Sequence, residues 1–442
     1  MEILVKITQL LLSLSILVIL HEFGHFAFAK IFKTRVEKFY LFFNPWFSLF
    51  KRKIGETEYG IGWLPLGGYV KISGMIDESM DKEQMKKPAE PYEFRAKPTW
   101  QRLFIMLGGV IVNFVLALVI YSAILFVWGD QYLPTKNVTN GIVVDSVAQS
   151  VGFCNGDKIL GVDNEYVVDF LQIVPNIVLN EAKTVQVERN GKKIDIEIPD
   201  EIIPILLHKP GFISVRIPFI VDGFAKNSKA KIAGLKKGDK IVGLNGNKIG
   251  FFDQFVDSLK NVDADIINVA VSRNNQILNL DIELTNDGII GVAPLGSLSE
   301  LFELEYTEYG FLEAIPAGID KGIETFKNYL KQLRLIFSPK TGAYKSLGGF
   351  ITIGNIFPGQ WDWHSFWSLT AFLSIILAIM NVLPIPALDG GHVVFLLYEM
   401  ISGRKPNDKV LEYAQIAGMI ILFSLLLYAN GNDVVKWITG KL

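Results

Sequence analysis

The stretch His21-Glu22-Phe23-Gly24-His25 decides the fold and chemistry that this sequence predicts, because it places two imidazoles and a carboxylate inside an apolar run. From Ile3 to Ile31 the only other charged residues are Lys6 and Lys30. Buried in a bilayer, such polar groups are costly unless something binds them. The run therefore predicts a membrane-spanning helix that carries a functional site.

On a helix, His21 and His25 lie one turn apart on the same face, so both can donate a ring nitrogen to one metal ion. Glu22 is then placed to take a proton from a metal-bound water, which is the arrangement of zinc hydrolases. In a soluble protein the same pattern also occurs on ordinary surface helices. A bilayer setting weakens that alternative, because the polar groups would lack water.

The composition predicts a membrane protein with substantial soluble mass, since half of the 442 residues are hydrophobic and the net charge is −2. The sequence has no cluster of basic residues of the kind that binds nucleic acid, so a nucleic-acid-binding protein is excluded. The single Cys154 excludes an internal disulfide framework, and the N-terminal stretch lacks a small-residue signal cleavage site. Four segments are apolar enough to span a bilayer: Ile3 to Phe32, Leu103 to Trp128, Phe366 to Leu388, and Tyr413 to Ala429.

Basic residues near the ends of these segments predict the orientation. They gather after the first segment, before the second, and between the third and fourth, around Arg404. Residues 33–100 and the short loop near 404 are therefore expected in the cytosol, whereas residues 129–365 and both termini lie outside. His21 precedes Lys30 by about 14 Å of helix. The metal site is therefore expected on the cytosolic side of the bilayer.

A twelve-residue motif occurs twice in the exported region, at Gly152 to Asp163 and at Gly234 to Asn245. A period of this length indicates a small domain present in two copies. The pattern Ser-x-Ala followed by Gly-hydrophobic-x-x-Gly-Asp-x-Ile resembles bacterial PDZ domains, which bind an extended peptide at an exposed strand edge. Residues Gly211 to Val215 are the expected groove-lining strand of the second copy. The alternative is that both copies are spacers or size filters that bind no peptide.

A catalytic zinc site needs a third protein ligand, and three candidates lie near the spans: His364, Asp389 and His392. Three tryptophans around His364 indicate an interfacial aromatic belt, which disfavours it. Asp389 and His392 end the stretch Asn381-Val382-Leu383-Pro384-Ile385-Pro386-Ala387-Leu388-Asp389-Gly390-Gly391-His392. Its two prolines break the helix where a buried site needs polar groups. Asp389 is a natural zinc ligand there, although a helix cap is the alternative.

The combination of HExxH in the first span, Asn-x-x-Pro-x-Pro-x-Leu-Asp-Gly-Gly-His in a later one, and a tandem repeat between them resembles the site-2 protease family. The resemblance covers nearly the whole chain. It implies a Zn²⁺ site formed by His21, His25 and Asp389, with Glu22 as the catalytic base. It also implies that Asn381 holds the substrate backbone and that His392 is no ligand.

Residues Gly60 to Gly74 resemble the membrane-dipping hairpin of the same family. Alternating apolar and small residues could form an edge strand that pairs with an unwound substrate segment, with Gly67, Gly68 and Tyr69 in contact with it. The alternative is an interfacial loop anchored by Trp63 and Tyr69. Farther along, apolar residues recur at helical spacing over 308–337, which predicts an amphipathic helix at the outer surface or against the PDZ pair. Packing on a partner is the alternative there.

The predicted fold is a polytopic α-helical membrane protein of about four transmembrane helices with two inserted α+β PDZ domains. The expected regions are transmembrane helix 1 (1–32), the cytosolic and hairpin region (33–100), transmembrane helix 2 (101–128), PDZ domain 1 (129–208), PDZ domain 2 (209–295), an amphipathic helix and linker (296–365), transmembrane helix 3 (366–400) and transmembrane helix 4 (410–430).

The leading hypothesis is a zinc metalloendopeptidase of a bacterial inner membrane that performs regulated intramembrane proteolysis on single-span proteins. The resemblance implies anti-sigma factors as substrates, with remnant signal peptides as a second class. PDZ ligands would be peptides. A membrane-anchored PDZ scaffold with a structural or vestigial metal site is the alternative, but a structural site needs no base such as Glu22. A metal transporter would need a polar path through the spans, where little more than Asn113 is available.

Overall fold

The computed structural model describes residues 1–65, 67–75, 88–207, 211–285 and 287–439. The chain forms two compact units. The first unit contains Met1–Gly129, Glu308–Arg334 and Tyr344–Leu442, and the second contains Asp130–Thr307 and Leu335–Ala343. The predicted functional residues outside the repeat all belong to the first unit.

Four helices in the described part of the chain are long and apolar enough to cross a membrane. They are α1 (Glu2–Ile31), α3 (Thr99–Trp128), α12 (Trp363–Val382) and α14 (Asp408–Ile438). Helix α3 packs against both α1 and α12. The prediction of four spans therefore agrees with the helices that form.

The third predicted span, Phe366 to Leu388, is wrong at its C-terminal end. Helix α12 stops at Val382, and helix α13 (Asp389–Ser402) begins only after a non-helical segment. Pro384 and Pro386 explain the break, because proline lacks a backbone N–H and clashes with the preceding helical turn. The region expected as transmembrane helix 3 over 366–400 therefore contains two helices, and the break that the two prolines predicted lies directly before Asp389.

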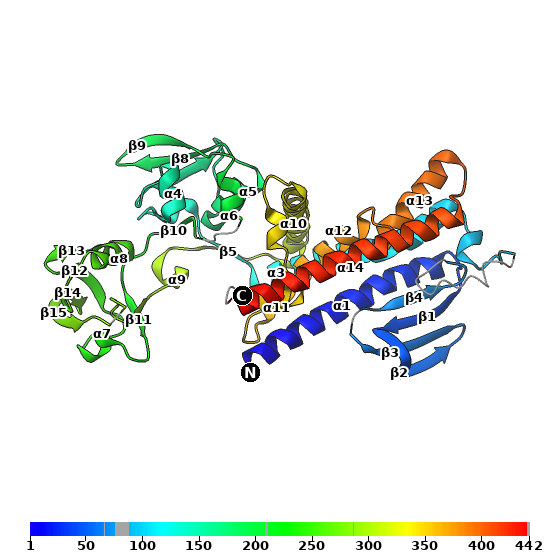
Figure 1. Cartoon of the computed structure of the whole chain (residues 1–442), viewed down its shortest axis with the longest axis horizontal. Coiled ribbons are helices and arrows are strands. Elements are labelled where there is room, and N and C mark those ends of the chain that lie inside the picture. The colour runs from blue at the N-terminus through cyan, green and yellow to red at the C-terminus, as the bar shows by residue number, and fades with distance from the viewer. Residues whose placement is uncertain (66, 76–87, 208–210, 286, 440–442) are drawn as a thin grey trace. The chain divides into compact units, whose positions relative to one another are not determined.

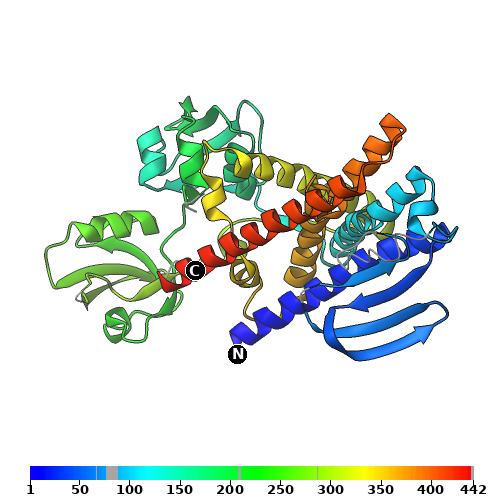
Figure 2. The same ribbon diagram turned by 45° about the vertical axis from the view of Figure 1, so that its right-hand side comes forward.

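A four-stranded sheet lies along the C-terminal half of α1 (Figures 1 and 2). Its strands are β1 (Val36–Leu41), β2 (Phe43–Ile54), β3 (Thr57–Leu64) and β4 (Tyr69–Ile72), in the order β2-β3-β1-β4. Strand β1 pairs with β3 in parallel and with β4 in antiparallel orientation. The hairpin expected over Gly60 to Gly74 is therefore wrong, because β1 lies between β3 and β4. Leu66, within that range, lies outside the described residues.

The remaining elements of the first unit include the amphipathic helix expected over 308–337. It forms as α10 (Phe311–Phe337), whose last three residues belong to the second unit. Its Phe326 and Tyr329 rings pack on Phe114 of α3 and Phe372 of α12. Its predicted position at the outer surface or against the PDZ pair stays a prediction. The shorter elements are η1 (Phe94–Ala96), η4 (Ala343–Ser346), whose first residue belongs to the second unit, and α11 (Phe350–Ile356).

The second unit contains both copies of the repeat, each with its own hydrophobic core. The first copy is built from β6 (Ile142–Val144), α4 (Ser146–Val151), β7 (Lys158–Val162), η3 (Phe170–Gln172), α5 (Ile173–Leu179), β8 (Thr184–Arg189), β9 (Lys192–Glu197), α6 (Ile202–Leu206) and β10 (Ile213–Val215). The second is built from β11 (Val221–Phe224), α7 (Lys229–Ile232), β12 (Lys240–Leu244), β13 (Asn247–Lys248), α8 (Phe252–Lys260), β14 (Ile266–Arg273), β15 (Gln276–Glu283) and β16 (Val292–Pro294). Strands β5 (Asp130–Tyr132) and β17 (Glu305–Thr307) pair beside η2 (Thr135–Asn137), and α9 (Leu298–Leu301) precedes β17.

The Gly-Asp turn of the repeated motif makes the same contacts in both copies. Arg189 Nε donates to Asp157 Oδ1 at 2.7 Å in the first copy, and Arg273 Nε donates to Asp239 Oδ1 at 2.7 Å in the second. In each copy the arginine also donates to the carbonyl of the first glycine of the motif. Both aspartates are almost fully buried, so the paired guanidinium supplies the charge and hydrogen bonds that burial demands.

One prediction about the repeat is wrong. Strand β10 pairs with β6 of the first copy, so Gly211 to Val215 is not the groove-lining strand of the second copy. The corresponding pair in the second copy is β11 with β16. In each copy the last strand therefore pairs with the first strand of the same copy. The sequence around these strands does not indicate which strand each one pairs with. The predicted boundary at 208 and 209 falls on residues outside the described part of the chain.

Candidate metal centre

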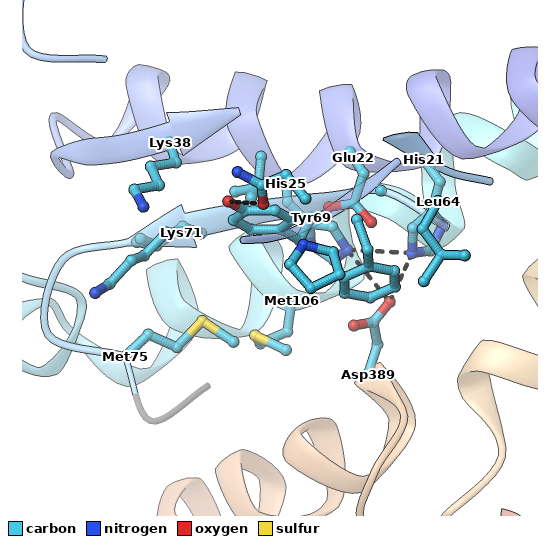
Figure 3. A pocket seen from close by; sticks show the side chains of 16 residues that line it. His21, Glu22, His25, Lys38, Leu64, Tyr69, Lys71, Met75, Met106 and Asp389 are labelled. Carbon is cyan, nitrogen blue, oxygen red and sulfur yellow. Dashed lines mark hydrogen bonds and ion pairs between the residues drawn. The ribbon is translucent and has the colours of Figure 1, made fainter. Parts of the chain in front are cut away.

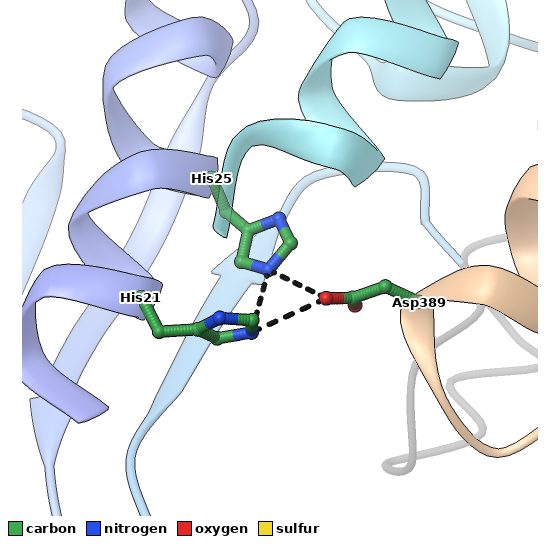
Figure 4. A group of neighbouring side chains, drawn as sticks. All are labelled: His21, His25 and Asp389. Atoms are coloured by element: carbon green, nitrogen blue, oxygen red, sulfur yellow. Dashed lines mark hydrogen bonds and ion pairs between the residues drawn. The ribbon is translucent and has the colours of Figure 1, made fainter. Parts of the chain in front are cut away.

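Three predicted ligand side chains converge in the first unit (Figure 4). His21 Nε2 and His25 Nε2 lie 3.3 Å apart, and they lie 3.2 and 3.3 Å from Asp389 Oδ2. The two rings come from adjacent turns of α1, and the carboxylate comes from the first residue of α13. In the described part of the chain this is the one group of three such side chains close enough to hold a metal ion.

The triangle of donor atoms fits a tetrahedral zinc ion. Bonds of about 2.0–2.1 Å place neighbouring ligand atoms of a tetrahedron about 3.3–3.4 Å apart. The three side chains are only 10–17% exposed, and among the described residues no hydrogen-bond donor reaches Asp389 Oδ2. His25 Nδ1 donates to the Ile105 carbonyl at 2.8 Å, so the neutral ring presents the Nε2 lone pair to the centre. Three lone pairs that face one another in this way are stabilised by a cation.

The segment between α12 and α13 brings Asp389 to the two histidines. Its chain turns back under the start of α13, and this close packing requires glycine. A Cβ on Gly390 would lie 2.3 Å from the Leu383 carbonyl oxygen, and a Cβ on Gly391 would lie 2.3 Å from Pro386 Cα. The Asp-Gly-Gly sequence is thus explained by a carboxylate followed by two positions with no room for a side chain.

The far end of α13 is tied to α3 by a buried ion pair. Arg102 Nη2 lies 2.5 Å from Glu399 Oε1, and both side chains are about one-tenth exposed. Thr99 donates to the same carboxylate oxygen at 3.2 Å. Because α3 also packs on α1, this pair fixes the helix of Asp389 to the scaffold that carries the histidines.

Glu22 lines a cavity of about 880 Å³ together with His21, His25 and Asp389 (Figure 3). A second carboxylate therefore lies beside the three side chains of the triangle. Apolar and polar groups of the sheet form much of the remaining wall. The arrangement has the parts that a hydrolytic site needs: a candidate metal centre, a neighbouring carboxylate, and room for a substrate segment.

Strand β4 forms one wall of this cavity, since Gly68, Tyr69, Val70, Lys71 and Ile72 all line it. Among the described strands, β4 stands at the end of the sheet order, next to β1. A Cβ on Gly68 would lie 3.2 Å from Glu22 Cγ and 2.8 Å from the Tyr40 carbonyl oxygen. Glycine therefore lets the backbone approach Glu22.

The Tyr69 ring is held in place by its neighbours. It stacks on Tyr40 and Phe43 at centroid distances of 5.3 and 6.1 Å, and its hydroxyl donates to Asn44 Oδ1 at 3.0 Å. Gly67 has φ of +135°, a conformation that favours glycine. Gly68 and Tyr69 thus line the cavity, while Gly67 is not among the described lining residues. Contact of all three with a substrate stays a prediction.

The structure does not bring the other predicted residues to the triangle. His392 lines a second cavity of about 310 Å³ with Arg102 and Glu399. His364 packs edge-on against Trp128 at 5.6 Å, consistent with its aromatic surroundings. Asn381, in the last turn of α12, is not among the described residues that line the main cavity, so its role in holding substrate stays a prediction.

Sequence reasoning missed the contribution of helix α3. Its Ile105 carbonyl accepts from His25, and its Asn113 amide lies 3.1 Å from His21 Nδ1. A backbone carbonyl leaves no sequence signal. Asn113 does leave one, because a fully buried amide within a charge-free span needs a partner.

Glycines allow α3 to come this close to α1. A Cβ on Gly24 would lie 2.2 Å from the Gly108 carbonyl oxygen, and a Cβ on Gly109 would lie 2.5 Å from the His21 ring. Small residues at a helix crossing let two backbones approach closely in a membrane. Gly24, at the second x position of HExxH, is thus explained by the close packing of α1 on α3.

Replacing Gly109 by alanine is expected to displace the His21 ring, destabilise the protein by about 1–3 kcal/mol and weaken metal binding. Metal analysis and thermal unfolding of the purified variant measure both effects. Gly354→Ala is the matched control, because its Cβ would meet α1 only at Leu10 Cδ2, at an ordinary 3.5 Å. Equal metal binding in the two variants would contradict the proposed crowding.

Comparison with known proteins places this chain in a family. Residues 9–425 match the model of peptidase family M50. The regulator of sigma E protease of Haemophilus influenzae is 28% identical over 99% of this chain and 100% of its own length. The regulator of sigma-E protease RseP of Salmonella typhimurium is 29% identical over 98% of this chain and 99% of its own. A Rickettsia conorii protein, named as a candidate zinc metalloprotease, is 28% identical over 97% of this chain and 98% of its own.

The chain belongs to peptidase family M50, the site-2 proteases. The resemblance to this family that the motifs suggested is confirmed, and relatives named regulators of sigma-E protease align with nearly the whole chain. Family and relatives support a bacterial membrane metalloprotease with zinc as its metal.

Proposed function

We propose that this protein is an intramembrane zinc metalloendopeptidase that hydrolyses peptide bonds of single-span membrane proteins within or near the bilayer. The observation that carries the proposal is the triangle of His21, His25 and Asp389 beside Glu22, with the histidines and the base on a helix apolar enough to span a membrane. A peptide bond in a membrane span is the substrate that a site on such a helix can reach.

The residues of the site have distinct roles in this proposal. His21, His25 and Asp389 would hold the zinc ion, which when bound would acidify a water molecule and polarise a carbonyl. The Glu22 carboxylate accepts a proton from the attacking water and delivers it to the leaving amine. The three side chains are only 10–17% exposed, and such burial strengthens the charge interactions between them.

Strand β4 would present the substrate. It is the end strand of the sheet that the described residues form, and it lines the same cavity as Glu22, so an extended substrate segment could add to the sheet there. A membrane helix satisfies its own backbone hydrogen bonds, and unwinding it exposes them. Pairing with β4 would replace part of these hydrogen bonds while the scissile peptide bond lies next to Glu22.

The alternative of a membrane-anchored PDZ scaffold with a structural or vestigial metal site is less well supported. Structural zinc sites are closed by four protein ligands. Only three converge here among the described residues, and a base and a cavity of about 880 Å³ adjoin them. These features favour a site that admits water and substrate.

The proposal is tested with purified protein and a single-span membrane protein, with and without a zinc chelator, by measuring product masses. We expect a cut within or next to the span, lost on chelation and restored by zinc. An uncut substrate would overturn the proposal, as would cleavage that persists without zinc.

The distribution of basic residues supports a bacterial inner-membrane protein with this site toward the cytosol and the second unit outside, in the periplasm. We propose that the repeat forms two PDZ domains, each built from short strands and short helices. Substrates of the anti-sigma-factor type, and remnant signal peptides, are proposed by resemblance to the family. The PDZ pair would then act on the exported part of such substrates.

Deleting residues 135–295 is expected to let the protease cut a substrate whose bulky outer domain has not been trimmed. The reason is that specificity can rest on a clash with large partners. Strands β5 and β17 lie outside the deleted range, so they can still pair with each other where the chain enters and leaves the deleted region. The rate of cleavage of trimmed and untrimmed forms is the measurement.

The opposite result separates two roles of the PDZ pair. If it recruits trimmed substrates by strand addition, the deletion should slow cleavage of the trimmed form and leave the untrimmed form uncut. Zinc content and cleavage of a short single-span peptide serve as controls for folding. A folded, zinc-loaded deletion variant with that behaviour would refute exclusion.

A further inference from the structure

The fully buried Asn113 side chain of α3 contacts the ring nitrogen of His21 that faces away from the candidate metal. Its amide nitrogen lies 3.1 Å from His21 Nδ1, and its amide oxygen Oδ1 is buried with no hydrogen-bond partner among the described residues. Asn113 is also fixed through its backbone, since Ser374 of α12 donates to its carbonyl at 2.7 Å. The amide is therefore held beside the ring by two helices.

Metal binding through His21 Nε2 decides which atom of this amide must face the ring. A neutral imidazole that ligates through Nε2 carries its proton on Nδ1, and a protonated Nδ1 can only donate. An NH₂ group beside it would then place two donors against each other. A half-turn of the amide about its Cβ–Cγ bond exchanges nitrogen and oxygen and turns the contact into a hydrogen bond.

We propose that Asn113 is a positioning residue that accepts the Nδ1 proton of His21 through Oδ1 and thereby keeps His21 in the tautomer that binds zinc. Helix α3 then serves both rings in the same way, because the Ile105 carbonyl already accepts from His25 Nδ1. Such partners of the outer nitrogen fix ring orientation and tautomer in metal sites. The inference rests on the proposed zinc site and adds the group that tunes one of its ligands.

Two substitutions separate an acceptor role from other roles. Asn113→Leu keeps the size of the side chain but offers no acceptor, whereas Asn113→Asp offers an acceptor oxygen in either orientation and has no NH₂ donor. Gln9→Leu is the matched control: Gln9 is also a fully buried amide of a membrane helix with an unpartnered oxygen among the described residues, and its nitrogen bonds Pro358 instead.

The measurement is the zinc dissociation constant of the purified full-length protein, by competition with a chromophoric chelator, together with the visible spectrum of the Co²⁺-loaded form. We expect Asn113→Leu to weaken zinc binding about 10–100-fold. Asn113→Asp should stay within about tenfold of wild type with a wild-type cobalt spectrum, because the acceptor is restored. Gln9→Leu should match wild type.

Three results would overturn the inference. Zinc binding that is unchanged in Asn113→Leu would show that the amide does not act on the ligand. Loss in Asn113→Asp, whether or not Asn113→Leu folds, would show that the donor is what matters. An equal loss of zinc affinity in Gln9→Leu would show that the effect of Asn113→Leu comes from helix packing in general. Wild-type protein that binds no zinc would instead refute the proposed function.

Discussion

Replacing Glu22 by glutamine is expected to abolish cleavage while one zinc ion per chain remains bound. The amide cannot accept a proton from water, and none of the three ligand groups is changed. General bases contribute about 10²–10⁴-fold to rate, so the loss should be at least about 100-fold. Cleavage of a single-span substrate and metal analysis of the same preparation measure both halves of the prediction.

Glu22→Asp serves as the matched variant, because it keeps the carboxylate but withdraws it by one methylene. It should bind zinc and retain more activity than the glutamine variant. Zinc loss in a folded Glu22→Gln protein would mean that Glu22 is a ligand or supports one. Turnover near the wild-type rate would remove it from the mechanism altogether.

Replacing Asp389 by alanine is expected to weaken zinc binding and remove activity together. Loss of a partner of a metal ligand typically weakens binding 10–100-fold, so loss of a ligand itself should exceed about 100-fold. His392→Ala is the matched control on the same helix, since His392 lines the second cavity with Glu399 rather than the triangle. It should keep wild-type zinc content.

Equilibrium dialysis against buffered zinc measures the zinc affinity of Asp389→Ala and of His392→Ala. If His392→Ala loses zinc and Asp389→Ala keeps it, the third ligand has been assigned to the wrong residue. If both lose zinc equally, the loss reflects the packing of α13 rather than ligation. Thermal unfolding of each variant distinguishes that last case.

The sequence indicates which side chains converge because their chemistry is local, although the choice of Asp389 over His392 depended on the resemblance to the family. HExxH requires only a helix to place His21 and His25 on one face, and the two prolines predict the break that exposes Asp389. Four spans follow from length and apolarity alone. What could not be predicted is the exact end of α12, because apolar composition continues through Leu383 to Leu388 beyond the point at which proline ends the helix.

Pairings between distant segments were the main source of error. The sheet places β1 between β3 and β4, so a stretch that alternates like a hairpin contributes two strands that do not pair. Strand β10 returns to β6 across some seventy residues, rather than starting the second copy as its position suggested. Periodicity predicts that a strand forms, but it does not say which strand becomes its neighbour.

The sequence did not predict that groups of α3 would contact His21 and His25, and the reason differs from that for the strand pairings. The groups that touch the outer nitrogens of His21 and His25 come from α3, one as a backbone carbonyl and one as an amide that appears isolated in sequence. Their positions depend on a close helix crossing at Gly24 and Gly109, which sequence spacing alone does not reveal. Buried polar residues in apolar spans are therefore worth tracing to a partner.

X-ray absorption at the zinc K-edge of the purified protein tests most directly that His21, His25 and Asp389 hold one zinc ion. The account predicts nitrogen and oxygen ligands at about 2.0–2.2 Å, outer-shell scattering from two imidazoles, and no sulfur at about 2.3 Å. In Asp389→Ala the spectrum should change or the metal should be lost. A sulfur ligand, an absence of imidazole scattering, or an unchanged spectrum in Asp389→Ala would contradict the account.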